Sequence, residues 1–520
     1  MATALWLLAV AGPAVAAGGA SVTTVPGAPL SGGLVPGPDG LLWHAGETDD
    51  SYGSRIVRIS ADGVTATTVP GYSPSRGAEP KMLPDGSMGL VVDRLDETGG
   101  GIGVAGLALA RLVPGSGALA AIMRLPPRVD DATALAVAPD GAVWFAKSCE
   151  DRLGRISPSR SVQYVRLSAT RCQRDLTDLE QGAALAFDPK GALWFADFCT
   201  GRVARVSLGG RVREWRAPRA GCASGESITS AVAVDPRGGI AFAARGSGGD
   251  VSGRIHGGRL EYFSSYGTGV FTPDGALWRV VSGEIERHDP NGSTTTVVHE
   301  THLVRWVSDL VPARNGGVAV VRATYWQSDP NYDSHNTFPR PEAYLDGHVV
   351  IVRRDRSETS WPLPDGGTDV SSQLSRAYLA LGSDGAFYVR ENRVAQPDFS
   401  SSSRLLRVLP DELAPPRPAT VRVSAVLGRV GRVLWVQVSC DAEIARFCLG
   451  TLRLTGGDVS RAPAQFALVG QSRGAVPVPL GARALRLLRH GGKLRTVAVV
   501  RTDDGTVTRS SVTIGSNAPR

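Results

Sequence analysis

A pattern of four short strands recurs along most of this chain, and it limits the fold more than any other feature of the sequence. The clearest copy is Ala184–Ala217, ALAFDPKGALWFADFCTGRVARVSLGGRVREWRA. In it, Ala184–Phe187 and Ala192–Ala196 flank an Asp-Pro-Lys-Gly turn, and a Gly-Gly turn separates Arg202–Ser207 from Val212–Ala217. Four short strands joined by Gly and Asp/Pro turns, repeated at roughly 40 to 55 residues, predict the blades of a β-propeller.

The turns of these units can be followed along the chain and give eight first strands. Ser21–Pro26 precedes the first unit and resembles a fourth strand, whereas the last unit ends at Leu405–Pro410 without a fourth strand of its own. An N-terminal strand that completes the last sheet closes a ring and removes an exposed edge. We therefore expect an all-β chain with an eight-bladed β-propeller over residues 20–413. Seven blades are the alternative if the degenerate second or seventh unit lies outside the ring.

The last hundred residues have a different character. Residues 414–418 contain three prolines and predict a stiff linker. Residues 419–520 consist of short strand-like segments without the Pro-Asp-Gly turn, which predicts a small, immunoglobulin-like β-sandwich. Gly481–His490 has helical apolar spacing and predicts a short helix or crossover whose arginines form a solvated face.

The N-terminus predicts export. Residues 1–17 are apolar and end in Ala14-Val15-Ala16, which is typical of a secretory signal peptide; a buried first strand is the alternative. No later stretch reaches the length of about eighteen apolar residues that a membrane-spanning helix needs. We therefore expect a secreted or cell-surface protein with no transmembrane segment after the signal peptide.

The formal charge of +7 is carried mostly by Arg, since only four of the 56 basic residues are Lys. The arginines are dispersed among acidic residues, so we expect no nucleic-acid partner.

Six cysteines in an exported chain predict disulfides. Two of them follow the second strand of successive units and two follow the fourth strand, and each such pair is 50 residues apart. This spacing favours bridges within a unit over bridges between units, and the two cysteines near the C-terminus most simply pair with each other. The expected bridges are Cys149–Cys172, Cys199–Cys222 and Cys440–Cys448.

The phrase PDG-x-[LV]-W-F-[AT]-[DE], followed by x-G-R-[IV]-S and a strand such as VREWRAP, resembles the repeat of the virginiamycin B lyases (streptogramin B lyases). The resemblance implies a ring whose active face carries the loops after each second strand and before each first strand. It also implies a Mg²⁺-dependent carbon–oxygen lyase that opens a cyclic depsipeptide or lactone. In that family a His ahead of a first strand and a Glu that ends a second strand perform the elimination.

This chain keeps that pattern only in part. No residue directly ahead of a first strand is a His, and at the Glu position only Asp197 and Glu391 are acids. His299 and His302 precede the seventh unit and are candidate substitutes for the base. In an active lyase, either Glu391 or Asp197 would bind the Mg²⁺ cofactor, and His299 or His302 would act as the base. Without a matched base, Asp197 is interpreted as a rim residue of the scaffold.

The longest insertion, Tyr325–Leu345, lies between the second and third strands of the seventh unit and predicts a rim loop or lid. Its Asp329–Asp333 segment opens like a calcium-binding loop but lacks the glycine and the terminal acid of such loops. The candidate binding residues are those of this loop and the basic residues that end second strands: Lys147, Arg322, Tyr325, Trp326 and Tyr332.

The sequence thus predicts an exported propeller that acts as a binding or interaction module for a small molecule, a glycan or a protein, with no certain cofactor. An active Mg²⁺-dependent lyase is the alternative.

Overall fold

The computed structural model describes the chain in segments separated by short gaps. They are residues 15–17, 20–25, 34–48, 51–60, 62–69, 72–74, 80–83, 85–98, 101–125, 134–146, 150–169, 183–217, 229–246, 249–263, 269–281, 284–298, 304–306, 308, 310–313, 316–326, 343–364, 372–395, 401–410, 419–442, 446–456, 459–460, 462–490 and 492–515. The predicted linker and most of the predicted signal peptide lie outside them.

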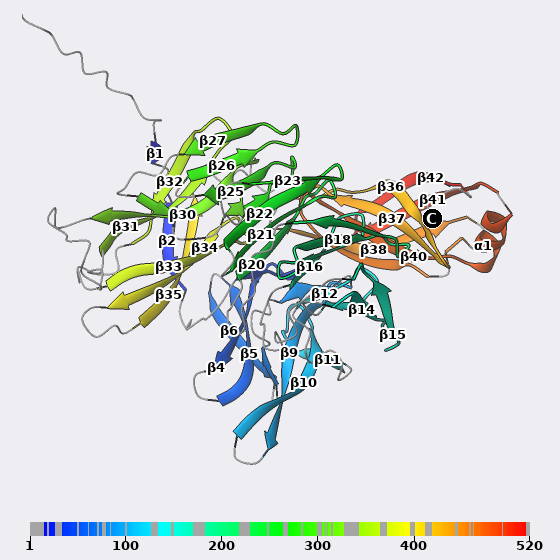
Figure 1. The fold of residues 1–520 in the computed structure, drawn as a ribbon, viewed down its shortest axis with the longest axis horizontal. Helices are drawn as coiled ribbons and strands as arrows, with labels where there is room; N and C mark the ends of the chain where they lie inside the picture. Colours follow the sequence, from blue (N-terminus) through cyan, green and yellow to red (C-terminus); the bar gives the residue numbers. More distant parts are fainter. Residues whose placement is uncertain are drawn as a thin grey trace, which may run out of the picture.

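In the described part of the chain, eight sheets share one arrangement: strands that follow one another in the sequence lie side by side and antiparallel. We number these sheets in chain order (Figure 1). Sheet 1 contains β3 (Val35–Pro36), β4 (Leu42–Thr48), β5 (Ser51–Ser60) and β6 (Gly63–Val69). In sheet 2, β7 (Tyr72–Pro74) and β8 (Lys81–Met82) both pair with β9 (Met88–Thr98), which is followed by β10 (Gly101–Leu112) and β11 (Leu119–Arg124). Sheet 3 contains β12 (Ala134–Val137), β13 (Val143–Ala146), β14 (Arg152–Ile156) and β15 (Val162–Arg166). Sheet 4 contains β16 (Ala183–Phe187), β17 (Leu193–Asp197), β18 (Arg202–Val206) and β19 (Val212–Arg216).

The remaining four sheets repeat the arrangement. Sheet 5 contains β20 (Thr229–Val234), β21 (Ile240–Gly246), β22 (Gly249–His256) and β23 (Arg259–Tyr262). Sheet 6 contains β24 (Gly269–Phe271), β25 (Leu277–Val281), β26 (Glu284–His288) and β27 (Thr294–Val298). In sheet 7, β28 (Val304–Trp306) and β29 (Val311–Pro312) both pair with β30 (Val318–Trp326), which is followed by β31 (Ala343–Val352) and β32 (Glu358–Pro362). Sheet 8 contains β33 (Ser372–Leu381), β34 (Phe387–Ala395) and β35 (Ser401–Pro410).

The N-terminal segment completes sheet 8, as the sequence predicts. β2 (Ala20–Thr24) pairs antiparallel with β35, with Ala20 opposite Pro410 and Thr24 opposite Leu406. The preceding strand β1 (Val15–Ala17) pairs in parallel with β32 of sheet 7. The last residues of the predicted signal peptide thus form the outer edge of that sheet.

Apolar side chains join neighbouring sheets in a cyclic order. The clusters join sheet 8 to sheet 1 and then sheets 1 to 2, 2 to 3, 3 to 4, 4 to 5, 6 to 7 and 7 to 8. Sheets 5 and 6 meet through polar contacts, such as the bond from Arg254 Nη1 to the Asp289 carbonyl oxygen, 3.2 Å. Each sheet therefore contacts the next along the chain, and the last contacts the first.

Two further sheets share a separate apolar core near the C-terminus. One contains β36 (Val421–Val430), β37 (Val433–Cys440) and β40 (Ser472–Pro479), and the other contains β39 (Ala464–Val469), β38 (Phe447–Thr455), β41 (Leu494–Thr502) and β42 (Val507–Ile514). The predicted short helix is confirmed as α1 (Ala482–Arg489), which buries Ala484, Leu485 and Leu488 in this core. We call residues 419–515 the C-terminal domain.

The C-terminal domain contacts turns between the first and second strands of the ring of sheets. Gln437 Nε2 donates a hydrogen bond to the Pro189 carbonyl oxygen, 3.4 Å. A Cβ atom placed on Gly191, which has φ +77°, would lie 3.0 Å from the Cβ of Ala475. In sheet 2 a Cβ on Gly86 would lie 3.6 Å from Leu449 Cδ2. The domain therefore lies against the end of the ring at which these turns gather.

In the described part of the chain, no helix has the length and apolar character that crossing a membrane requires.

Candidate functional site

The polar residues of the repeated phrase hold the turn between the first and second strands. In sheet 4 the buried Asp188 uses both carboxylate oxygens: Oδ1 accepts from the backbone N–H groups of Lys190 and Ala192, both at 2.9 Å. Its Oδ2 accepts from Trp194 Nε1 at 3.3 Å and from Arg205 Nη2 at 2.9 Å. Both oxygens of this carboxylate are thus engaged in fixing the turn and in linking it to the second and third strands of the sheet.

The same ion pair recurs in other sheets. It joins the turn aspartate to an arginine of the third strand in Asp85–Arg111, Asp140–Arg155 (2.5 Å), Asp274–Arg287 (2.8 Å) and Asp384–Arg407 (2.8 Å). In sheet 5 a histidine takes the place of the arginine, with His256 Nδ1 3.0 Å from Asp235 Oδ2. Because these residues stabilise turns, the phrase that resembles the lyase repeat describes the scaffold.

Asp197 is fully buried, although the sequence suggests a rim position. It ends β17, and its Oδ1 accepts from the backbone N–H groups of Cys199 and Thr200 at 3.1 and 3.3 Å. This arrangement shapes the connection to β18. Asp197 therefore stabilises a loop from a position that solvent does not reach.

Glu391 is also fully buried and lies on β34 of sheet 8. Its Oε2 accepts from Arg404 Nε at 2.6 Å, and Arg404 Nη2 donates to the Pro364 carbonyl oxygen at 2.6 Å. A Cβ on Gly347 of sheet 7 would lie 3.8 Å from Glu391 Oε1. Arg404 of sheet 8 thus joins the buried Glu391 of its own sheet to the Pro364 carbonyl group, which follows β32 of sheet 7.

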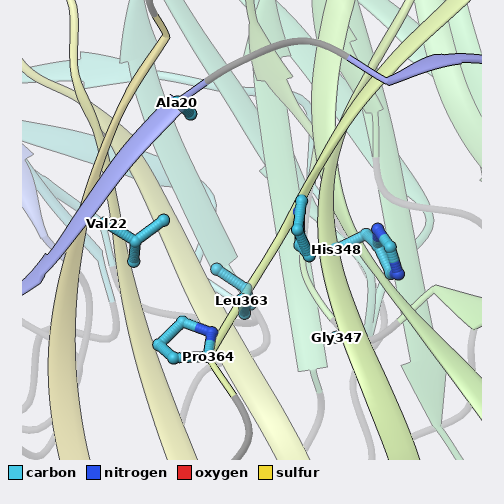
Figure 2. A pocket seen from close by; sticks show the side chains of 7 residues that line it. Ala20, Val22, Gly347, His348, Leu363 and Pro364 are labelled. Carbon is cyan, nitrogen blue, oxygen red and sulfur yellow. The ribbon is translucent and has the colours of Figure 1, made fainter.

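A cavity of about 400 Å³ lies beside this contact, between the outer strands of sheets 7 and 8. Figure 2 shows Val22 of β2 close to Leu363 and Pro364, which follow β32, while the imidazole of His348 lies further along β31. His348 is the one titratable side chain among the residues that line it. The sequence alone gives no sign of this cavity.

Arg322 is the predicted binding residue whose side chain the structure describes best. It lies on β30 opposite His348, and its Nη1 is 3.0 Å from Oε2 of the buried Glu358. The Arg322 side chain is 20% exposed. It therefore pairs with Glu358 inside sheet 7 and still reaches the surface of that sheet.

The other predicted site residues are described less fully. Tyr325 and Trp326 belong to β30, where the structure gives their backbone only. Lys147, His299, His302, Tyr332 and the calcium-like segment Asp329–Asp333 lie outside the described residues.

Neither predicted acid leaves room for a hydrated magnesium ion. Asp197 and Glu391 are each fully buried, and each carboxylate already accepts a hydrogen bond. Magnesium is held by carboxylates that leave room for several of its waters. Within the described ranges, no group of three or more His, Cys, Asp or Glu could hold a metal ion.

A buried charged cluster joins sheets 5 and 6. Arg279 Nη2 donates to Ser252 Oγ at 3.1 Å, and its Nη1 lies 3.6 Å from Glu286 Oε2. His288 Nε2 lies 3.0 Å from the same carboxylate oxygen, and the ring of Phe263 packs against both basic groups. Burial lowers the pKa of Arg279 to about 10 and also lowers the pKa of His288, while Glu286 opposes both shifts. Sequence reasoning missed this cluster because its members come from two different units.

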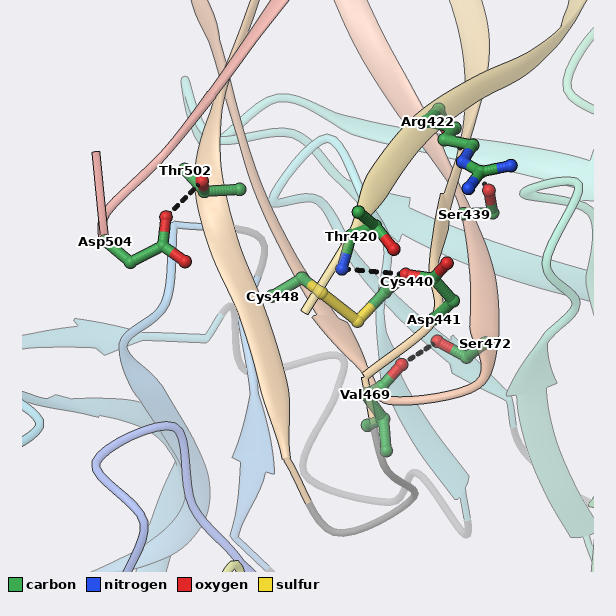
Figure 3. The surroundings of a disulfide bond; sticks show 10 residues. All are labelled: Thr420, Arg422, Ser439, Cys440, Asp441, Cys448, Val469, Ser472, Thr502 and Asp504. Carbon is green, nitrogen blue, oxygen red and sulfur yellow. Dashed lines mark hydrogen bonds between the residues drawn. A yellow bond between two sulfur atoms is a disulfide. The ribbon is translucent and has the colours of Figure 1, made fainter. Parts of the chain in front are cut away.

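The disulfide Cys440–Cys448 is confirmed and joins β37 to β38 at one end of the C-terminal domain (Figure 3). Asp441 beside it accepts a hydrogen bond from the backbone N–H of Thr420 at 2.8 Å. Cys199 is also disulfide-bonded. The other cysteines of the two predicted bridges in sheets 3 and 4 lie outside the described residues, so those pairings stay predictions.

No protein-family model matches the chain, and no curated protein matches it. Among solved structures, a streptogramin B lyase is 14% identical with a TM-score of 0.39, over 75% of this chain and 98% of that one. A virginiamycin B lyase from Staphylococcus aureus is 13% identical with a TM-score of 0.34, over 75% of this chain and 99% of that one. YCF48 bound to D1 peptide is 12% identical with a TM-score of 0.37, over 78% and 99%. Likenesses at this level say nothing of activity, so the function has to follow from the chain's own residues.

Proposed function

We propose that the chain is an exported, eight-bladed β-propeller with a C-terminal β-sandwich, and that it acts as a binding module for a small molecule, glycan or protein. The blade count is supported by the eight sheets of one arrangement and by their cyclic contacts. The sandwich is supported by two antiparallel sheets around one core. Export is supported by the apolar N-terminus and the disulfides.

The observation that carries the proposal is the commitment of both candidate acids to structural contacts. Asp197 holds a backbone loop, and Glu391 holds Arg404, each with no exposed surface. In the alternative lyase one of these acids would bind the magnesium ion, which requires a carboxylate oxygen that faces the substrate site. Neither acid is placed to touch a bound cyclic peptide, whereas a binding module needs only a rigid ring with shaped loops.

The position of the C-terminal domain indicates which face of the ring binds. It covers turns between first and second strands, through Gln437 on Pro189 and through Ala475 beside Gly191. Connections between second and third strands leave the opposite end of each antiparallel sheet. The long insertion between β30 and β31 is one of these connections. The proposed binding face is therefore the end of the ring that the domain leaves uncovered.

The first experiment separates binding from catalysis. The purified full chain is incubated with a streptogramin B, with and without EDTA, and ring opening of the antibiotic is followed by mass spectrometry. We expect no linearisation at high protein concentration. Linearisation that EDTA abolishes would establish the lyase and overturn the binding-only function.

The second experiment tests the binding face. A variant in which a short Gly-Ser segment replaces residues 327–342 is compared with the parent in a glycan-array and small-molecule thermal-shift panel. A matched control carries Ala475→Arg, which disturbs the opposite end. We expect ligands of the parent to be lost by the loop variant and kept by the control; the reverse result would place binding on the other face.

A further inference from the structure

The net charge of the chain comes entirely from its C-terminal part. Residues 419–520 contain 15 Lys and Arg against 5 Asp and Glu, a formal charge of +10. Residues 1–418 contain 41 against 44, a formal charge of −3, which together give the net +7. Such an asymmetry between two parts of a chain is typical of a part that meets an anionic partner.

Six of these 15 cations lie at one end of the C-terminal domain, which we call the tip. It comprises α1, residues 492–495 after it and the hairpin between β36 and β37. The backbone N–H of Leu480 donates to the Arg432 carbonyl oxygen at 2.8 Å, which places that hairpin beside the start of α1. No Asp or Glu occurs in residues 481–495. The exposed cations of the tip are Arg432, Arg483, Arg486, Arg489, Lys493 and Arg495.

The like charges of α1 repel one another, although Arg486 and Arg489 lie in the last turn, where the helix dipole favours a cation. Arg483, Arg486 and Arg489 follow one another at three-residue spacing, so they form one row of like charges. Arg483 lies in the first turn, where the helix dipole disfavours a cation, and the first turn contains no acid. A surface needed only for solubility would intersperse both signs. A bound anionic surface would relieve the repulsion within this row.

Two large apolar side chains protrude among these cations. Leu487 of α1 is 43% exposed, and Val430 at the hairpin is 39% exposed. The other leucines of the helix, Leu485 and Leu488, are buried in the core. Protruding apolar residues within a basic surface suit a lipid interface, where they enter the headgroup region while the cations bind lipid phosphates. A linear polyanion would bind the cations but leave both apolar side chains in water.

The tip is free while the domain contacts the ring. Gln437 and Ala475, which contact the ring, lie midway along β37 and β40. The hairpin precedes β37 and α1 follows β40, so both lie at the same end of these two antiparallel strands. Figure 1 shows α1 as the element of this domain that is farthest from the ring. The ring and the tip can therefore be occupied at the same time.

We propose that the tip binds the surface of anionic lipid bilayers and holds the ring at a membrane surface as a peripheral attachment. The cations attract anionic headgroups, while Leu487 and Val430 insert shallowly. This inference does not depend on what the ring binds.

The test is co-sedimentation of the full chain with vesicles of phosphatidylcholine alone or with about 30% phosphatidylglycerol, at low and high salt. The tip variant is R483Q/R486Q/R489Q. Its matched control, R422Q/R473Q/R501Q, removes the same charge from exposed positions elsewhere on the domain. Thermal unfolding of each variant verifies the fold, and L487Q tests the tip without a change of charge.

We expect binding only to the anionic vesicles and weaker binding at high salt. The tip variant should lose affinity by roughly a hundred-fold and the control by less than about ten-fold, because each cation at the membrane contributes about one order of magnitude or less. L487Q should weaken binding severalfold. Equal losses in the two triple variants, or binding to DNA or heparin with none to anionic vesicles, would overturn the proposal. If the tip triple variant does not fold, L487Q decides: unchanged vesicle binding by L487Q would also overturn it.

Discussion

Replacing Asp188 by Ala should destabilise the ring by about 3 kcal/mol, the lower end of the range for breaking a buried ion pair. The side chain of Asp188 is fully buried and accepts from Trp194 Nε1 and Arg205 Nη2 as well as from the backbone of its turn. Without it, the indole N–H loses its acceptor inside the sheet. Arg205 keeps 30% exposure and can regain water, which is why the cost should not reach the upper end of that range.

The matched control is Asp140→Ala in sheet 3. Asp140 occupies the same turn position and binds Arg155, and it also accepts from a backbone N–H, but it retains 28% exposure. Both side chains of this pair are reached by solvent, so its contribution should lie near the roughly 0–1 kcal/mol of solvent-accessible ion pairs. We therefore expect Asp188→Ala to cost about 2 kcal/mol more than Asp140→Ala.

The assay is urea-induced unfolding, followed by tryptophan fluorescence. A shift of the unfolding midpoint reports a change in stability when the dependence of the unfolding free energy on urea concentration is unchanged. Equal costs for the two variants, or a cost below about 1 kcal/mol for Asp188→Ala, would refute the reasoning that burial sets the contribution of this pair.

Three further changes test other contacts. Gly154→Ala should cost about 1–3 kcal/mol in denaturant unfolding, because its Cβ would lie 1.9 Å from Phe145 Cζ; a neutral result would contradict this packing. Burial lowers the pKa of His288 below its usual 6.5, so the unfolded chain binds more protons in acid and stability should fall as the pH drops below about 6.5. His288→Gln should flatten that part of the curve of melting temperature against pH, and an unchanged curve would exclude His288 as its source. Replacing Cys440 and Cys448 together by Ser should cost the C-terminal domain about 2.5 kcal/mol, measured by its unfolding midpoint, because the bridge closes a short loop; no change in the midpoint would contradict that account.

The strands could be predicted closely because the turn chemistry is local. In the unit Ala184–Ala217 the predicted strands agree with β16 to β19 to within one residue at each end, since Asp188 and Gly191 fix the turn by themselves. The N-terminal strand of sheet 8 could be predicted because the last unit lacks its own fourth strand. The short helix of the C-terminal part followed from its apolar spacing.

The candidate site could not be predicted in the same way, because it depends on contacts between units. Nothing in the local sequence of Asp197 shows that its carboxylate folds back onto two backbone N–H groups. The partner of Glu391 is 13 residues away on the next strand, and the cavity beside them combines residues from both ends of the ring's sequence, from Val22 to Pro364. The periodicity of the sequence identifies the strands, but it does not show which ends of the strands are covered by other parts of the protein.

The turn aspartates and their basic partners recur in six of the eight sheets, where they stabilise turns. They therefore cannot by themselves distinguish one ligand from another. Asp188 with Arg205, and Asp384 with Arg407, make the same contact in sheets far apart in the sequence. What differs between units is therefore where specificity has to lie: the long insertion of sheet 7, the charged seam between sheets 5 and 6, and the cavity beside His348. The C-terminal domain makes the two ends of the ring unequal, since it lies against one of them and carries a basic tip at its own far end. When the tip binds an anionic surface, the ring is held in a defined orientation. Its uncovered end is then directed away from the C-terminal domain.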